Sequence, residues 1–282
     1  MQSVLEILKK CEEFFAQKGV PTPKLDAQLL LARAMKCKRL DLFLRFEEPL
    51  AGAVLDEFRE FARRRAKREP LQHILGTVEF CGLTLKCDAR ALVPRPETEE
   101  LCDILITRLK DSPPKKILDL GTGSGAIILS LKNAFPSAEC SACDISTAAL
   151  ALARENAALT NLSVNFFESD WLAKIPEGEK FDLIVSNPPY LTAAEVENAQ
   201  EEVRRFDPPS ALSSPDEGAA DLRKIIAQAP QFLNSGGILA LECGIAHPKM
   251  LKAENAENKD FSQIEILPDL SGRDRFLIFA RA

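Results

Sequence analysis

The sequence predicts an α/β protein with a Rossmann-like, mostly parallel sheet and a small helical bundle in front of it. From about Lys116 onward, short apolar segments alternate with helical patterns, which is typical of a parallel sheet covered by helices on both faces. The first seventy residues carry helical periodicity instead. We therefore expect a helical domain over 1–70, a linker over 71–111 and an α/β domain over 112–282.

Four short amphipathic segments make up the expected bundle. The first begins after Ser3, a suitable N-cap, and stops at Gly19, with apolar residues every three or four positions. The same periodicity is found in three further segments, 25–35, 40–46 and 54–66. Helices this short need a shared core, so we expect them to pack together.

The linker and the α/β domain contain the remaining elements. Alternating apolar residues predict a hairpin over 79–87, and a helix is expected from Pro96 to about Leu109. Strands are expected at 117–120, 138–143, 163–167, 181–186, 237–242, 262–267 and 276–280. Helices are expected at 126–134, 147–159 and 219–233.

Composition and charge exclude some classes of protein. No apolar run approaches the ~20 residues that span a membrane, and the N-terminus lacks the pattern of a signal peptide, so we expect a cytoplasmic protein that binds no membrane. The net charge of −6 argues against a nucleic acid as the main partner. One basic cluster, Arg63–Arg68, is either a solvated helix end or a patch for an acidic protein or RNA.

The cysteines do not indicate a metal site. Eight are present, and in the cytoplasm they are expected to be reduced thiols. Cys140 and Cys143 form a lone C-x-x-C within an expected strand, where residues three apart point to opposite faces. Only His73 and His247 could add ligands, so small buried thiols are the better interpretation.

A glycine-rich turn, Gly121–Gly125, follows the first expected strand. Its glycines allow a sharp turn and close approach of a ligand to the helix N-terminus, although the pattern alone is also compatible with a dinucleotide. Asp144, after the second strand, is either an acceptor for ribose hydroxyls or a helix N-cap. Asp119 would repel a pyrophosphate but attract an ammonium group. Asp170 and Trp171 offer an acceptor and an aromatic surface for adenine, unless the Trp is ordinary packing.

Asn187-Pro188-Pro189-Tyr190 directly follows the apolar strand 181–186. Two consecutive prolines cannot donate backbone hydrogen bonds and have fixed φ angles, so this tetrapeptide is a rigid stub at the carboxyl edge of the sheet. It offers carbonyl oxygens, an amide and an aromatic face to a planar group that contains nitrogen. The alternative is a turn that only ends the strand.

Together these segments resemble the successive motifs of class I S-adenosylmethionine-dependent methyltransferases. The segments that narrow the resemblance are 72–76, 79–83, 92–99, 206–212 and 269–275. They are similar to the release factor glutamine methyltransferases (the HemK/PrmC family). His73 and Asp207 depart from this family, which often has Tyr and usually has Glu at these positions.

The resemblance implies a class I methyltransferase domain, a helical substrate-recognition domain, and methylation of the glutamine in the Gly-Gly-Gln loop of peptide chain release factors. The residues implied in binding S-adenosylmethionine are Asp119, Gly121, Thr122, Gly123, Ser124, Gly125, Asp144, Asp170, Trp171 and Asn187. Asn187, Pro188, Pro189 and Tyr190 would hold the glutamine.

An amide nitrogen is a poor nucleophile, and no side chain is basic enough to deprotonate it, so positioning and electrostatics must supply the rate. We expect the oxygens of Asn187 and Pro188 to accept the two amide protons while Tyr190 packs on the amide, which makes these three the catalytic residues.

Three other functions stay open at this stage. A nucleic-acid adenine methyltransferase would share the Asn-Pro-Pro-Tyr stub but should carry a basic groove. An NAD-dependent oxidoreductase is compatible with the glycine turn alone. A release-factor-binding module without catalysis would keep the same fold.

Overall fold

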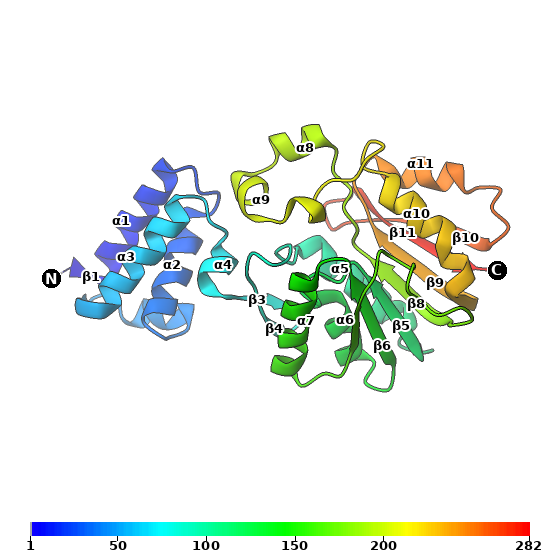
Figure 1. Ribbon diagram of the computed structural model, residues 1–282. Coiled ribbons are helices and arrows are strands. Elements are labelled where there is room, and N and C mark those ends of the chain that lie inside the picture. The colour runs from blue at the N-terminus through cyan, green and yellow to red at the C-terminus, as the bar shows by residue number, and fades with distance from the viewer. Residues whose placement is uncertain (1) are drawn as a thin grey trace. The chain divides into compact units, whose positions relative to one another are not determined.

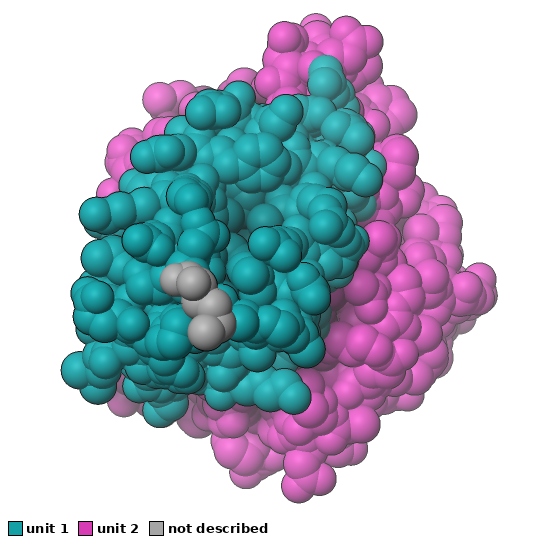
Figure 2. Space-filling view, turned by 90° about the vertical axis from the view of Figure 1, so that its left-hand side faces the viewer, with its two compact units in different colours: residues 1–77, 200–206 teal, residues 78–199, 207–282 magenta. Residues whose placement is uncertain are grey.

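The computed structural model describes residues 2–282, which divide into two compact units (Figures 1 and 2). The first unit runs to Thr77 and includes the later segment Gln200–Phe206. The second unit comprises Val78–Ala199 and Asp207–Ala282. The division into domains 1–70 and 112–282 with a linker over 71–111, expected from the sequence, stays a prediction.

The first unit is a helical bundle. Its main helices are α1 (Val4–Gln17), α2 (Pro23–Ala34) and α3 (Gly52–Ala66), and its core includes Phe15, Leu30 and Leu31. The short elements are β1 (Gln2–Ser3), η1 (Arg39–Leu44), β2 (Pro49–Leu50), α4 (Leu71–Leu75) and α9 (Glu201–Phe206). The cap expected at Ser3 is confirmed, because its hydroxyl accepts from Glu6 N–H while the Glu6 carboxylate accepts from Ser3 N–H.

The α-helix expected over 40–46 is wrong, because this segment forms the 3₁₀ helix η1. Only Leu42 is buried there, whereas Leu40 and Leu44 are 70% and 89% exposed. One buried side chain gives a helix too little apolar contact with the core to hold several α-turns.

The second unit contains a seven-stranded sheet in the order β10-β11-β9-β8-β5-β6-β7 (Figure 1). Its parallel strands are β5 (Lys116–Leu120), β6 (Glu139–Asp144), β7 (Asn165–Glu168), β8 (Phe181–Ser186) and β9 (Leu233–Glu242). The antiparallel strands β10 (Phe261–Pro268) and β11 (Asp274–Arg281) form one edge. The expected mostly parallel sheet is therefore confirmed.

Helices cover both faces of this sheet. Successive strand residues point to opposite faces, and Ile117 and Leu118 belong to two different hydrophobic cores, each of which includes helix residues. One face is covered by α5 (Pro96–Leu109), α6 (Ala126–Ala134) and α7 (Thr147–Thr160). The other is covered by α10 (Ala220–Gln228), η3 (Ala229–Phe232) and α11 (His247–Glu254). Pro230 explains why the helix expected over 219–233 ends early, since proline lacks the N–H that an α-turn needs.

The remaining elements of the second unit are short. The expected hairpin is confirmed as β3 (Thr77–Phe80) and β4 (Leu83–Lys86). Thr77, the first residue of β3, still belongs to the first unit. Sequence periodicity did not indicate α8 (Ala193–Asn198), η2 (Pro209–Ala211) or α11. Among residues 2–282, no helix is both long enough and apolar enough to cross a membrane.

The strand order reverses at β5. From β5 the chain continues to β6 and β7 on one side, whereas β8 and β9 lie on the other. The register aligns the ends of these strands, with Leu120 opposite both Cys143 and Ser186. The Ser186 hydroxyl also donates to the Leu120 carbonyl at 2.7 Å. In open α/β sheets, ligands bind at the carboxyl edge beside such a reversal.

Candidate active site

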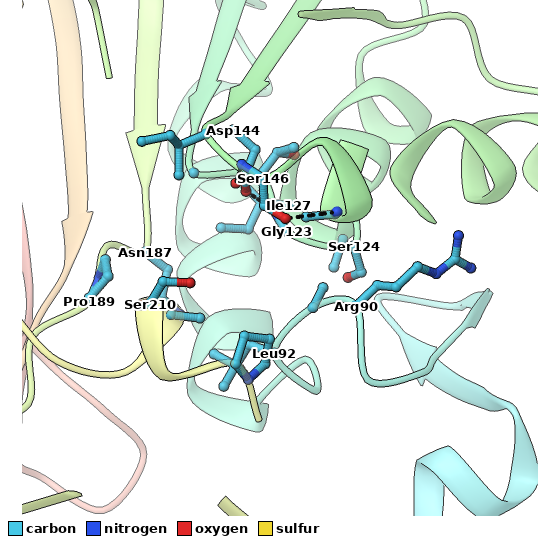
Figure 3. A pocket seen from close by; sticks show the side chains of 18 of the residues that line it. Arg90, Leu92, Gly123, Ser124, Ile127, Asp144, Ser146, Asn187, Pro189 and Ser210 are labelled. Carbon is cyan, nitrogen blue, oxygen red and sulfur yellow. Dashed lines mark hydrogen bonds between the residues drawn. The ribbon is translucent and has the colours of Figure 1, made fainter. Parts of the chain in front are cut away.

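A cavity of about 410 Å³ lies at this carboxyl edge, entirely within the second unit (Figure 3). Its walls come from the glycine turn, the ends of β6 and β8, and the loops over 90–98, 169–171 and 208–213. Pockets of ~300–1,000 Å³ typically bind small molecules or cofactors. The cavity therefore has the size and position of a cofactor site.

The glycine turn brings the backbone close to an aromatic ring. Gly121 has φ +69°, and a Cβ at this position would lie 3.1 Å from Cζ3 of Trp171. A side chain at Gly121 would thus be strained by the positive φ and would require the indole to shift by a few tenths of an ångström. Thr122, Gly123 and Ser124 also line the cavity, whereas Gly125 is the N-cap of α6 and packs against Ala153.

Asp119 lies on β5, two positions before Gly121, and is fully buried, so it does not itself line the cavity. The Thr122 hydroxyl donates to its Oδ2 at 2.6 Å, whereas Oδ1 has no hydrogen-bond partner among residues 2–282. Burial raises the pKa of Asp119 to about 7, and the Asp144 carboxylate adds to this. A buried carboxylate with one oxygen unused is suited to a cation, because a buried charge needs a partner.

Asp144 ends β6 and lines the cavity. Its Oδ2 accepts from Gly123 N–H at 2.9 Å, as Figure 3 shows, and its Oδ1 accepts from Ser146 N–H at 2.8 Å. The N-cap of α7 is Ser146, whose Oγ accepts from Ala149 N–H. The alternative in which Asp144 is the N-cap is therefore wrong. Burial raises the pKa of Asp144, and the backbone donors oppose this.

Trp171 and Asp170 follow β7 and both line the cavity. The indole Nε1 of Trp171 donates to Oδ1 of Asp221 at 3.0 Å, and Asp221 Oδ2 accepts from Ser214 at 2.7 Å. These bonds fix the plane of the indole beside Gly121. Asp170 is half exposed and pairs with Lys224 at 2.7 Å. The Trp is thus held as one wall of the cavity.

Two residues of the Asn-Pro-Pro-Tyr stub supply another part of the cavity wall. Asn187 and Pro189 line the cavity, whereas Pro188 is buried and Tyr190 lies outside the lining. The Asn187 Nδ2 donates to Thr98 Oγ1 at 3.1 Å, and within residues 2–282 no hydrogen bond uses its Oδ1. The Tyr190 hydroxyl donates to Glu242 Oε1 at 3.1 Å. Asn187 therefore keeps a side-chain acceptor for a ligand.

The backbone of Gly218 packs closely against the backbone of the stub at Tyr190. It has φ +84°, and a Cβ there would lie 2.1 Å from the carbonyl oxygen of Tyr190, far inside van der Waals contact. We expect Gly218→Ala to displace the stub and to reduce turnover at least ~10-fold, since shifts of about 1 Å cost up to 10²-fold. Turnover of this variant should be compared with that of Gly178→Ala, where a Cβ meets nothing within 4 Å and φ is similarly positive. Equal activities would contradict this role.

Three side chains at the site, those of Glu242, Thr98 and Asp221, were not predicted from the sequence. Glu242 ends the expected strand 237–242, so the rule about carboxyl edges could have indicated it. Thr98 lies in the segment 92–99 that carries the resemblance, but nothing in its position suggested a contact with Asn187. No sequence signal indicated Asp221. Cys140 and Cys143 are confirmed as buried thiols, and burial raises their pKa values to about 11 and about 12.

The sheet order, the glycine turn after β5 and the Asn-Pro-Pro-Tyr stub after β8 define a class I S-adenosylmethionine-dependent methyltransferase. Residues 6–76 match the family model for the PrmC N-terminal domain, and residues 97–205 match the model for the methyltransferase small domain. The chain belongs to the release factor glutamine methyltransferase family.

Curated relatives support this membership along the whole chain. A release factor glutamine methyltransferase of Deinococcus radiodurans is 42% identical over 98% of this chain and 98% of its own length. One from Rhodopirellula baltica is 35% identical over 99% and 97%. Among solved structures, a methyltransferase from Pyrococcus furiosus shares the fold, with 21% identity, a TM-score of 0.51 and coverage of 71% of this chain and 89% of its own.

Proposed function

We propose that this protein transfers a methyl group from S-adenosylmethionine to the side-chain amide nitrogen of the glutamine in the Gly-Gly-Gln loop of peptide chain release factors. The observation that carries the proposal is Asn187, which lines the cavity with an unused Oδ1, while the fully buried Asp119 on the neighbouring strand β5 keeps an unpaired Oδ1. One group suits an amide N–H, and the other suits a cation. Family membership supports the choice of a release factor as the protein substrate.

The residues around the cavity fit S-adenosylmethionine. The orphaned oxygen of Asp119 would accept from its ammonium group, Asp144 from its ribose hydroxyls, and Trp171 would pack on its adenine. Asp170 and the turn Gly121–Gly125 complete the walls that would enclose the nucleoside and the methionine chain. When bound, the group supplies an electrophilic methyl on a sulfonium centre.

The residues of the stub would then act on the glutamine. Oδ1 of Asn187 and the carbonyl of Pro188 would accept the two amide protons, which orients the nitrogen lone pair toward the methyl group. Both bonds strengthen as positive charge grows on nitrogen, so they stabilise the transition state more than the ground state. Tyr190, held by Glu242, would pack on the plane of the amide. After transfer, the extra proton leaves to water.

Incubation with a purified release factor and methyl-labelled S-adenosylmethionine tests this function. We expect one label per release factor, mapped by peptide mass spectrometry to the glutamine of the Gly-Gly-Gln motif. A release factor with alanine in place of that glutamine is the control and should stay unlabelled. Label on another residue, or on a nucleic acid added in its place, would overturn the proposal.

The role of Asp119 predicts how cofactor affinity depends on pH. Only the ionised carboxylate binds an ammonium group strongly, and the pKa of Asp119 is raised to about 7. Affinity should therefore rise up to about tenfold per pH unit below pH 7 and level off above it, until the ligand's amine deprotonates near pH ~8. Calorimetry between pH 5.5 and 7.5 measures this.

Asp119→Asn removes the titrating group from the same site. At pH 7.5 this variant should bind S-adenosylmethionine ~10–100-fold more weakly, because hydrogen bonds to charged groups contribute ~1.5–3 kcal/mol. Its affinity should also lose the pH dependence. An Asn variant with the same slope as the wild type would contradict the assigned role.

We also propose that the protein works in the cytoplasm. All eight cysteines are free thiols in the described part of the chain. Reduced thiols are typical of that compartment. Fractionation of cells that express a tagged chain tests this directly.

A further inference from the structure

A chain of hydrogen bonds connects Asn187 to a buried acid behind the site. Asn187 follows β8, Thr98 lies in the first turn of α5, and Glu242 ends β9. Asn187 Nδ2 donates to Thr98 Oγ1 at 3.1 Å, and Thr98 Oγ1 donates to Glu242 Oε2 at 2.7 Å. Thr98 and Asn187 line the cavity, whereas Glu242 is 1% exposed.

The number of protons in this chain fixes its direction. A threonine hydroxyl has a single proton, and the short bond to Glu242 uses it. Towards Asn187, Thr98 can therefore only accept, so it must face the NH₂ group of the amide. With the amide turned over, two oxygens would face each other and one hydrogen bond would be lost. The oxygen of Asn187 is thereby directed away from Thr98.

Glu242 also holds the other end of the stub. Its Oε1 accepts from the Tyr190 hydroxyl at 3.1 Å, so one carboxylate connects to both Asn187 and Tyr190. Arg275 lies close by, with its guanidinium 6.0 Å from the centre of the Tyr190 ring. Burial raises the pKa of Glu242, whereas the bonds from Thr98 and Tyr190 and the charge of Arg275 oppose that rise. These contacts favour the carboxylate form that accepts from both hydroxyls.

We propose that Thr98 and Glu242 are positioning residues that set the orientation of the Asn187 amide and thereby select glutamine over glutamate. An outward oxygen on Asn187 accepts from the NH₂ group of a glutamine side chain. The same oxygen would repel a glutamate carboxylate, which has no proton to donate. The inference rests on the proposed function and adds to it the reason why the site accepts an amide and rejects a carboxylate.

We call the hydrogen bonds that connect Glu242 through Thr98 to Asn187 the relay. Thr98→Val and Thr98→Ser form a matched pair that tests it. Valine keeps the shape of threonine but cannot accept from Asn187, so kcat should fall ~10–100-fold, as expected for a lost charge-linked hydrogen bond. Serine keeps the hydroxyl and should recover most of that loss. The affinity for S-adenosylmethionine, measured by calorimetry, should stay within a few fold in both variants.

The direct readout is discrimination between two substrates. Binding of a release factor should be compared with binding of the same factor in which the Gly-Gly-Gln glutamine is replaced by glutamate. The wild type should prefer glutamine, and Thr98→Val should reduce that preference by roughly tenfold. Thr160→Val is the control, because the Thr160 hydroxyl only contacts carbonyls of its own helix. It should leave kcat and preference unchanged.

Each result has one meaning. If the wild type does not methylate the release factor, the proposed function fails, whatever the Thr98 variants do. If the wild type is active and Thr98→Val matches it, or if valine and serine lower kcat equally, the relay is overturned. Should Thr98→Val not fold, Glu242→Gln supplies the second test. Its amide can donate to Thr98 and frees the threonine proton for a reversed Asn187, so it should also lower kcat and the preference for glutamine.

Discussion

Replacing Asn187 with alanine is expected to lower kcat by ~10²–10³-fold, the loss seen when one preorganised group that stabilises transition-state charge is removed. The side-chain oxygen of Asn187 is the acceptor that the protein orients at the cavity. Its bond to the substrate nitrogen gains strength only as that nitrogen becomes positive. The loss should therefore appear in kcat rather than in the affinity for the release factor.

Single-turnover rates at saturating release factor and cofactor measure this loss. Asn234→Ala is a matched control, because Asn234 also donates its amide to one side chain, Asp182 at 2.8 Å, but lies at the start of β9 on the opposite edge of the sheet. It should leave the rate within about twofold of the wild type. If Asn187→Ala turned over normally and bound the cofactor as the wild type does, Asn187 would have no catalytic role.

The sequence was sufficient to predict which residues share the carboxyl edge. Asp119, Asp144 and Asn187 each stand at the end of an apolar segment, and parallel strands bring such ends together whatever the details of packing. Local patterns also indicated the cap at Ser3 and the end of α5 at about Leu109. These features depend on short-range chemistry that a few neighbouring residues determine.

Contacts between distant residues could not be predicted in this way. Thr98 and Glu242 are 144 positions apart, and their bond exists only because α5 packs beside the end of β9. The segment Gln200–Phe206 belongs to the first unit through Glu202, whose partner Arg68 lies 134 positions earlier. Neither pair has a periodicity or a motif. The hydrogen bond between Asn187 and Thr98 joins two uncharged side chains, so the pattern of charges in the sequence does not indicate it either.

The largest effect on stability is expected from Arg65→Ala, which should destabilise the helical unit by ~3–5 kcal/mol because it leaves a buried charge without its partner. Arg65 is 4% exposed and donates to Asp26, which is 1% exposed, at 2.7 Å. It also pairs with Glu202 at 2.8 Å. The Thr22 hydroxyl donates to the other Asp26 oxygen at 2.6 Å but cannot neutralise the charge.

Hydrogen exchange of the buried amides in α2 and α3 measures this loss within the full chain, since it reports the opening of one unit. Arg63→Ala is the control, because Arg63 pairs with Glu60 on the surface, where such pairs contribute ~0–1 kcal/mol. Equal protection in the two variants would contradict the buried network. Four residues of the basic cluster, Arg63, Arg64, Arg65 and Arg68, pair with acidic residues of the same unit.

A double replacement separates the cost of the unpaired charge from the value of the pair. Asp26→Leu combined with Arg65→Met removes both charges and keeps much of the apolar volume, so it should destabilise less than Arg65→Ala alone. In this double variant Glu202 would keep its two hydrogen bonds from Arg68, at 2.8 and 2.5 Å. Burial raises the pKa of Glu202, but the hydrogen bonds from arginine outweigh this and the pKa is lowered. That remaining stabilisation should be full above pH ~4.5 and should be lost as the pH falls through the lowered pKa of Glu202. A double variant less stable than Arg65→Ala would show instead that the ion pair itself, and not the avoidance of a lone buried charge, stabilises the unit.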